Sequence, residues 1–186
     1  MIKNKIWTPQ PKQRLMLSRG EDEGFYGGAA GGGKSDYLVI EAVRQVKVPN
    51  YRGLILRKTV PELEQLIERA RYYYTQLCAD VKFNDTKHTF TFPSGAKVQF
   101  GSLFRTQDKF KYQGLQYDFI GFDELTQFTF DEYSYLKSRN RASGPGTRVY
   151  VRATGNPGGV GHGWVKKEFV TAGKPFTTIW KKLAVK

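Results

Sequence analysis

The sequence predicts an α/β fold in which helices flank a mostly parallel central sheet. Three observations lead to this prediction. A glycine-rich segment at 27–35 separates a short apolar stretch from a helical apolar pattern. Two further apolar stretches, at 53–57 and 117–122, have a second helical pattern between them. A hairpin pattern at 89–100 adds either an insertion or an antiparallel edge to this sheet.

Length and composition favour a single globular domain. The chain has 186 residues, of which 39% are hydrophobic and 25% charged, and this is enough for one core. No apolar run is long enough to span a membrane, and the single cysteine, Cys78, is typical of a protein from a reducing cytosol. The formal net charge of +13 favours DNA or RNA as a partner, although charge can also serve solubility alone. His88 and His162 have no cysteine pair near them, which disfavours a zinc site.

The glycine-rich segment is the strongest motif in the chain. It reads Gly27-Gly28-Ala29-Ala30-Gly31-Gly32-Gly33-Lys34-Ser35 and matches the phosphate-binding pattern G-x-x-x-x-G-K-[ST]. Small residues let backbone N–H groups surround a polyphosphate, and a helix expected at 35–46 directs the positive end of its dipole toward it. We therefore expect residues 28–35 to bind ATP, with Lys34 at the β- and γ-phosphates and the Ser35 hydroxyl on Mg²⁺. A surface turn that matches by chance is the alternative.

The first twenty residues are expected to form a basic, irregular arm on the adenine side of the site. Pro9 and Pro11 argue against a regular helix there. Gln10 and Gln13 are both candidates for binding the adenine edge, because a glutamine amide donates and accepts hydrogen bonds together. Trp7 could pack near the base. For each of these residues an ordinary N-terminal arm is the alternative.

A buried strand and a long helix follow the first helix. Residues 53–57 are short and apolar, and a Thr59–Glu62 capping box with Pro61 in the first turn begins a helix to about Leu77. One apolar face of this helix is expected to pack in the core. It consists of Leu63, Leu66, Ile67, Ala70, Tyr73 and Leu77.

A basic loop from 101 to 114 follows the hairpin. It carries Arg105, Lys109 and Lys111, with Phe104, Phe110 and Tyr112 between them. Basic and aromatic side chains in alternation suit contacts with a nucleic-acid backbone and stacking on bases. The alternative is a solvated loop whose aromatic rings pack inward.

Asp123 and Glu124 directly follow the apolar strand at 117–122. Successive side chains of a strand point in opposite directions, so two acids at its end can serve two tasks. We expect Asp123 to bind Mg²⁺ and Glu124 to activate the attacking water as a general base. An Asp-Glu pair alone is a weak signal, but its combination with the glycine-rich loop predicts a nucleotide hydrolase.

Arginines near the end of a helix expected at 130–140 are candidates for an arginine finger. Arg139 and Arg141 could reach the γ-phosphate of a neighbouring subunit, and Arg105 is the next candidate. The alternative is that they only complement the helix dipole.

The strand expected at 148–154 ends in Thr154, and Asn156 follows it. Polar groups at this place can contact the γ-phosphate and sense its loss, which converts hydrolysis into movement. A short helix is expected at 161–170.

Together, these segments resemble the ATPase domain of the large terminase subunit of tailed bacteriophages. The matching segments are 26–35, 54–59, 122–128, 138–141 and 154–157. The resemblance covers nearly the whole chain and implies a RecA-like P-loop fold of the class with an additional strand and a catalytic glutamate (ASCE). It implies that Asp123 and Glu124 form the Walker B pair, that 154–156 is the coupling motif, and that Gln10 or Gln13 senses adenine.

The resemblance also implies a function and partners. Terminase large subunits hydrolyse ATP with Mg²⁺ to drive double-stranded DNA into a procapsid. They act in the host cytoplasm as a ring on the portal protein, together with a small terminase subunit and with an arginine supplied between subunits. They usually carry a nuclease domain, but no acidic cluster remains for it, so we expect one ATPase domain over 1–186 without nuclease activity.

Two other functions remain open at this point. One is a RecA-like DNA-dependent ATPase or helicase, which would separate strands. The other is a nucleotide-gated DNA-binding assembly module that does not hydrolyse ATP. Glu124 argues against the second, because a module that only binds ATP has no need of this carboxylate.

Overall fold

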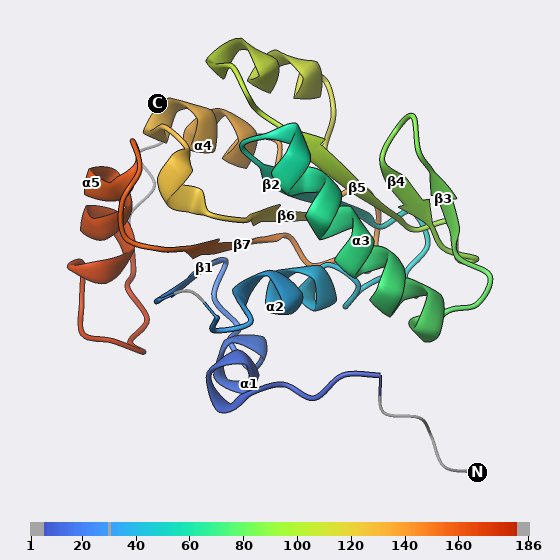
Figure 1. The fold of residues 1–186 in the computed structure, drawn as a ribbon, viewed down its shortest axis with the longest axis horizontal. Helices are drawn as coiled ribbons and strands as arrows, with labels where there is room; N and C mark the ends of the chain where they lie inside the picture. The colour runs from blue at the N-terminus through green and yellow to red at the C-terminus, as the bar shows by residue number, and fades with distance from the viewer. Residues whose placement is uncertain (1–5, 30, 182–186) are drawn as a thin grey trace.

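One mixed sheet forms the centre of a computed structural model that describes residues 6–29 and 31–181 (Figure 1). Within this part of the chain the sheet has 7 strands in the order β1-β7-β6-β2-β5-β4-β3. They are β1 (Glu23–Gly27), β2 (Arg52–Arg57), β3 (Lys82–Asn84), β4 (Thr89–Thr91), β5 (Lys97–Ser102), β6 (Phe119–Phe122) and β7 (Tyr150–Gly155). The strands from β1 to β5 in this order are parallel, whereas β4 and β3 are antiparallel. The predicted fold class is confirmed, and the hairpin is an antiparallel edge of the main sheet.

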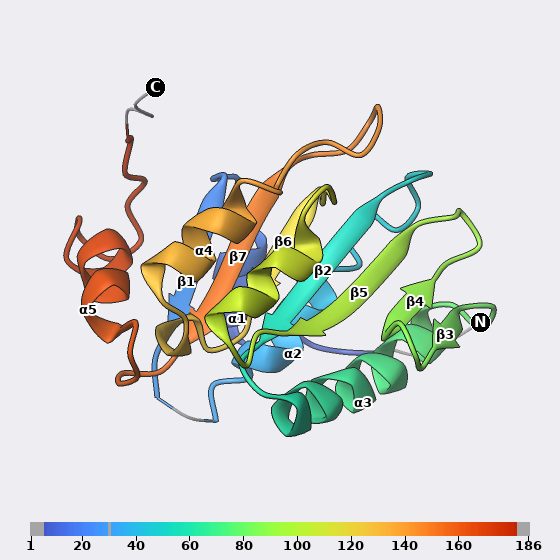
Figure 2. The ribbon, with the colours of Figure 1, turned by 90° about the horizontal axis from the view of Figure 1, so that it is seen from above.

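Helices cover both faces of the sheet. They are α1 (Pro11–Leu17), α2 (Lys34–Glu41), α3 (Val60–Leu77), η1 (Thr106–Tyr112), η2 (Leu125–Gln127), α4 (Phe130–Lys137), α5 (His162–Val165) and η3 (Lys166–Val170). In Figures 1 and 2, α2 and α3 lie on one face, while η1 and α4 lie on the other. The core is accordingly split into two layers, and β2 shows why: Ile55 packs in one layer, while Leu54 and Leu56 pack in the other. No helix within the described residues is both long and apolar enough to cross a membrane.

The helix after the glycine-rich loop is shorter than the expected 35–46. α2 ends at Glu41, and the chain continues in tighter turns, in which the Val46 N–H donates to the Val43 carbonyl at 3.2 Å. A regular helix would instead pair this N–H with the Ala42 carbonyl. The hydroxyl of Tyr51, which is fully buried, donates to that carbonyl at 2.7 Å. A contact distant in sequence therefore competes with the helical hydrogen bond.

The irregular N-terminal arm is also a wrong expectation for the described residues. Pro11 occupies the first turn of α1, where a missing N–H costs nothing, so the proline begins the helix instead of preventing it. Residues 1–5 of the expected arm lie outside the described part of the chain.

Helix α3 is confirmed, but its cap and part of its buried face differ. The Thr59 hydroxyl donates to the Glu62 carboxylate at 2.6 Å and makes no capping hydrogen bond, so the capping box does not form. Tyr74 is fully buried and donates to the Val39 carbonyl at 2.8 Å, whereas Tyr73 is half-buried and Leu77 is exposed. The helix is rotated because the Tyr74 hydroxyl finds a partner in α2.

The expected loop at 101–114 contains η1, which turns part of its aromatic and basic side chains inward. Tyr112 is buried, and the buried Lys109 pairs with Asp131. Phe104 and Phe110 remain exposed, at 67% and 53%. Farther along the chain, the helix expected at 130–140 ends at 137, the strand expected from 148 begins at 150, and the helix expected at 161–170 divides into α5 and the π-helical η3.

Candidate nucleotide site at the carboxyl edge of the sheet

The register of the parallel strands brings the predicted site residues together. Leu56 in β2 pairs with Phe122 in β6, which pairs with Ala153 in β7. The next residues of these strands, Arg57, Asp123 and Thr154, therefore meet at one edge. On the other side of β7, Gly27 pairs with Gly155, so the glycine-rich loop leaves the sheet at the same edge. Ligands of open α/β sheets bind at this edge.

The glycine-rich loop has the backbone conformation that its sequence requires. Gly28, Gly31 and Gly33 have φ of +147°, +82° and +64°, which side-chain-bearing residues rarely adopt. Lys34 is 7% exposed, and its Nζ donates to the Gly28 carbonyl at 3.1 Å and to the Ala29 carbonyl at 2.7 Å. The lysine thus lies over its own loop. Ala30, also expected in the loop, lies outside the described residues.

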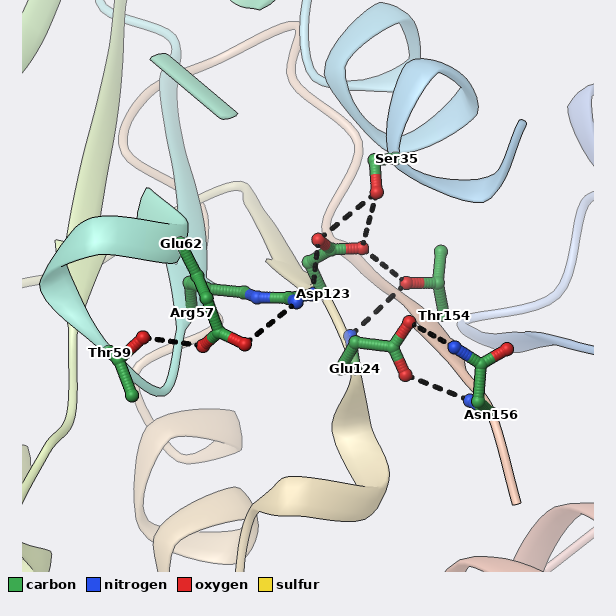
Figure 3. A network of polar contacts seen from close by, with 8 residues as sticks. All are labelled: Ser35, Arg57, Thr59, Glu62, Asp123, Glu124, Thr154 and Asn156. Carbon is green, nitrogen blue, oxygen red and sulfur yellow. Dashed lines mark hydrogen bonds and ion pairs between the residues drawn. The ribbon is translucent and has the colours of Figure 1, made fainter. Parts of the chain in front are cut away.

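Asp123 is the centre of a polar network (Figure 3). Its carboxylate accepts from the Ser35 hydroxyl at 3.2 and 3.3 Å, from Thr154 Oγ1 at 2.6 Å and from Arg57 Nη1 at 2.6 Å. A carboxylate facing a serine hydroxyl fits Mg²⁺, which takes few protein ligands and completes its shell with water and phosphate oxygens. Consistent with this, the described residues contain no cluster of three or more acidic, histidine or cysteine side chains suited to a metal.

Glu124 has an unusual backbone. Its φ and ψ are both 58°, the left-handed region, where a residue other than glycine is uncommon and costs free energy. Both carboxylate oxygens bind Asn156: Oε1 accepts from the side-chain Nδ2 at 2.7 Å, and Oε2 from the backbone N–H at 2.9 Å. A strained residue that is held in place by its neighbours is typical of a functional site.

Arg57 is a residue that the sequence reasoning missed. Besides Asp123 it binds Glu62, with Nη2 to Oε1 at 3.2 Å. Burial raises the pKa of Glu62, but the hydrogen bond from Thr59 and the charge of Arg57 outweigh it, so the pKa lies below its ordinary value. The signal for Arg57 was available, since it ends a buried strand that was predicted to lie in the same parallel sheet as the strand before Asp123.

Comparison with protein families identifies the fold around this site. A family model described as the N-terminal part of the terminase large subunit, T4likevirus type, matches residues 25–183. The chain belongs to this terminase family. A comparison with curated proteins finds no match.

Solved terminase structures share the fold at low sequence identity. The ATPase domain of the large terminase of Thermus phage P74-26 is 16% identical, with a TM-score of 0.66 over 91% of this chain and 74% of that chain. A full large terminase from a thermophilic bacteriophage is 22% identical, with a TM-score of 0.66 over 88% of this chain and 43% of that one. The N-terminal domain of the bacteriophage phi29 DNA-packaging ATPase is 19% identical, with a TM-score of 0.55 over 92% and 83%. These likenesses confirm the RecA-like fold, and this terminase chain spans less than half of the second of these proteins.

A cleft of about 260 Å³ lies beside the carboxylates of the terminase site. It is lined by Arg57, Glu124, Thr126, Gln127, Asn156, Pro157, Gly158 and Gly159. The strained glutamate therefore borders a space with room for water molecules.

The arginine candidates lie at two places on the terminase fold. Arg139 and Arg141 form backbone hydrogen bonds with Tyr117, which precedes β6, so they lie at the end of the strand opposite Asp123. Arg105 is exposed and follows the carboxyl end of β5, the edge that carries the site. A role for any of them in another subunit stays a prediction.

Proposed function

We propose that this terminase domain hydrolyses ATP with Mg²⁺ and couples the reaction to the movement of double-stranded DNA into a procapsid. The observation that carries the proposal is the strained Glu124 beside the Ser35–Asp123 pair. A packing role alone gives no reason to hold a carboxylate in a costly backbone conformation at the edge of a cleft.

The glycine-rich loop is proposed to bind the phosphates of ATP through its backbone N–H groups. Lys34 then exchanges the two loop carbonyls for phosphate oxygens, because a charged partner is the stronger acceptor. Ser35 and Asp123 hold Mg²⁺, which neutralises phosphate charge when bound. Arg57 has to leave Asp123 at the same time, since a guanidinium and a divalent cation repel each other.

Glu124 is proposed to accept the proton of the water that attacks the γ-phosphorus. For this its carboxylate has to leave Asn156 and turn toward the cleft. Asn156 and Thr154 lie on the same strand end, so a change at Glu124 or Asp123 also moves β7 and the loop after it. This is the proposed path from phosphate loss to DNA movement.

Related proteins support nucleotide binding and a packaging role. The large terminase of the thermophilic bacteriophage has been solved in complex with ADP, and the phi29 relative is named a DNA-packaging ATPase. We propose for this chain double-stranded DNA, the portal of a procapsid and the small terminase subunit as partners, and a ring in which Arg139, Arg141 or Arg105 acts on the neighbour's ATP. The net charge of +13 supports the DNA partner.

ATP turnover by the wild type, Lys34→Ala and Lys47→Ala, with and without double-stranded DNA, tests the proposal. Lys47 is exposed after α2 and controls for the loss of one positive charge. We expect turnover to vanish only in Lys34→Ala. Turnover accompanied by separation of DNA strands would favour a helicase. ATP binding without turnover, even at high protein concentration and with DNA, would favour an assembly module.

A further inference from the structure

Gln13 lies where a ligand cannot reach it. Its side chain is 2% exposed although it belongs to the N-terminal helix α1. Its Nε2 donates to the Gly33 carbonyl at 2.6 Å, and its Oε1 accepts from the Gln10 N–H at 2.7 Å. An amide that reads an adenine edge has to present both atoms to the base. In this structure both atoms of Gln13 face the protein.

The contact acts on the peptide that carries the Lys34 N–H. The C=O of Gly33 and the N–H of Lys34 belong to one planar trans peptide and point in opposite directions. Tyr37 N–H also donates to this carbonyl, at 3.0 Å, and Gln13 adds a second donor from another helix. With the carbonyl fixed on the protein side, the Lys34 N–H is fixed on the opposite side, where the loop binds phosphate.

The preceding peptide is held in the same way. The Tyr26 hydroxyl donates to the Gly32 carbonyl at 2.9 Å, which orients the Gly33 N–H. Gly33 itself has φ of +64°, and a Cβ at this position would collide with Nε2 of Gln13. The amide of Gln13 therefore fits against the loop only because position 33 is glycine.

We propose that Gln13 is a positioning residue for the phosphate-binding loop and that it does not read the base. The proposal rests on the nucleotide binding proposed above. It leaves Gln10, which is exposed and begins α1, as the candidate for the adenine edge. It also makes α1 part of the phosphate site, because this helix holds the loop through Gln13.

The two roles predict different patterns of binding. A positioning residue affects every ligand that uses the loop, whatever its base. A base reader affects ATP and changes the discrimination against GTP. One neutral hydrogen bond corresponds to about a three- to tenfold change in affinity.

Calorimetry on Gln13→Met decides between these patterns. Methionine keeps the length of the side chain but has neither an amide donor nor an amide acceptor. The probes are the non-hydrolysable imido analogues of ATP and GTP and inorganic tripolyphosphate, each with Mg²⁺. We expect about the same three- to tenfold loss for all three. A loss confined to the ATP analogue, or no loss for any probe, would overturn the proposal.

Gln10→Met is the matched variant, with the same substitution three positions earlier. It is expected to leave tripolyphosphate affinity unchanged, and a loss there equal to that of Gln13→Met would contradict the assignment. Thermal unfolding of both variants controls for loss of fold.

Amide hydrogen exchange across 31–36 gives a readout without any ligand. We expect faster exchange in Gln13→Met than in the wild type, and equal rates would also overturn the proposal. If the wild type binds none of the probes, the proposed function fails, and the exchange measurement still decides whether Gln13 orders the loop.

Discussion

Replacing Glu124 by glutamine separates the catalytic role of the carboxylate from its structural role. Asn156 presents two donors to Glu124, Nδ2 at 2.7 Å and the backbone N–H at 2.9 Å. A carboxylate accepts both, but a glutamine amide has one oxygen and one NH₂ group. One donor of Asn156 must then face another donor, which costs about 1–1.5 kcal/mol. For a chain of this length the melting temperature falls by about 2–6 °C.

The same substitution removes the proposed general base. We expect kcat for ATP to fall by about a hundred- to ten-thousandfold, while nucleotide affinity is retained. The assays are steady-state turnover, calorimetry with the imido analogue of ATP, and thermal unfolding. Turnover within about threefold of the wild type would refute the assignment of Glu124 as the base.

The double variant Glu124→Gln/Asn156→Asp is the matched control. It restores the pairing of donors with acceptors, because the new carboxylate at position 156 accepts from the glutamine NH₂ while the glutamine oxygen accepts from the backbone N–H. We expect the melting temperature to recover while turnover stays low. A double variant no more stable than the single one would show that the Glu124–Asn156 contact does not form in solution.

Three further outcomes are expected. Gly159→Ala should lower the melting temperature by about 4–8 °C, because φ is +82° and the new Cβ would lie 3.0 Å from the Thr126 carbonyl carbon. Gly158→Ala, with φ of +106° and nothing within 4 Å, should cost less, and an equal loss would contradict the steric argument. Because the pKa of Glu62 is lowered in the folded state, its stabilising effect is complete above the unfolded pKa of about 4.3 and is lost as pH falls through the folded pKa. The melting-temperature difference between wild type and Glu62→Gln at pH 7 should therefore vanish toward about pH 3, and a constant difference would refute the ion pair with Arg57. Affinity for double-stranded DNA should fall steeply with salt concentration because phosphate contacts release counterions, whereas a flat response would argue against a backbone contact.

Local patterns predicted the parts of the fold that depend on local chemistry. Strand β2 followed from a short apolar run, and the glycine-rich loop and the acidic pair Asp123–Glu124 were found at the ends of their strands. The parallel sheet then places these ends at one edge. For this reason much of the candidate site could be assembled before any coordinates were known.

The differences arise where one distant contact decides the outcome. Tyr51 ends α2 early by binding the Ala42 carbonyl, and Arg57 draws Glu62 away from its capping position. The left-handed backbone of Glu124 leaves no mark on residue type, since glutamate has no preference for it. Such features require the positions of neighbours that lie far apart in the sequence.

The position of β1 in the sheet has a consequence for the order of folding. β1 pairs with β7, so the strand that leads into the glycine-rich loop finds its partner only when the chain has reached residue 155. Closing so long a loop is an entropic cost that is met late in folding. During synthesis, an N-terminal fragment can form β2 and α3 while the loop still lacks its support. The ability to bind a nucleotide therefore reports that the chain has been completed through β7.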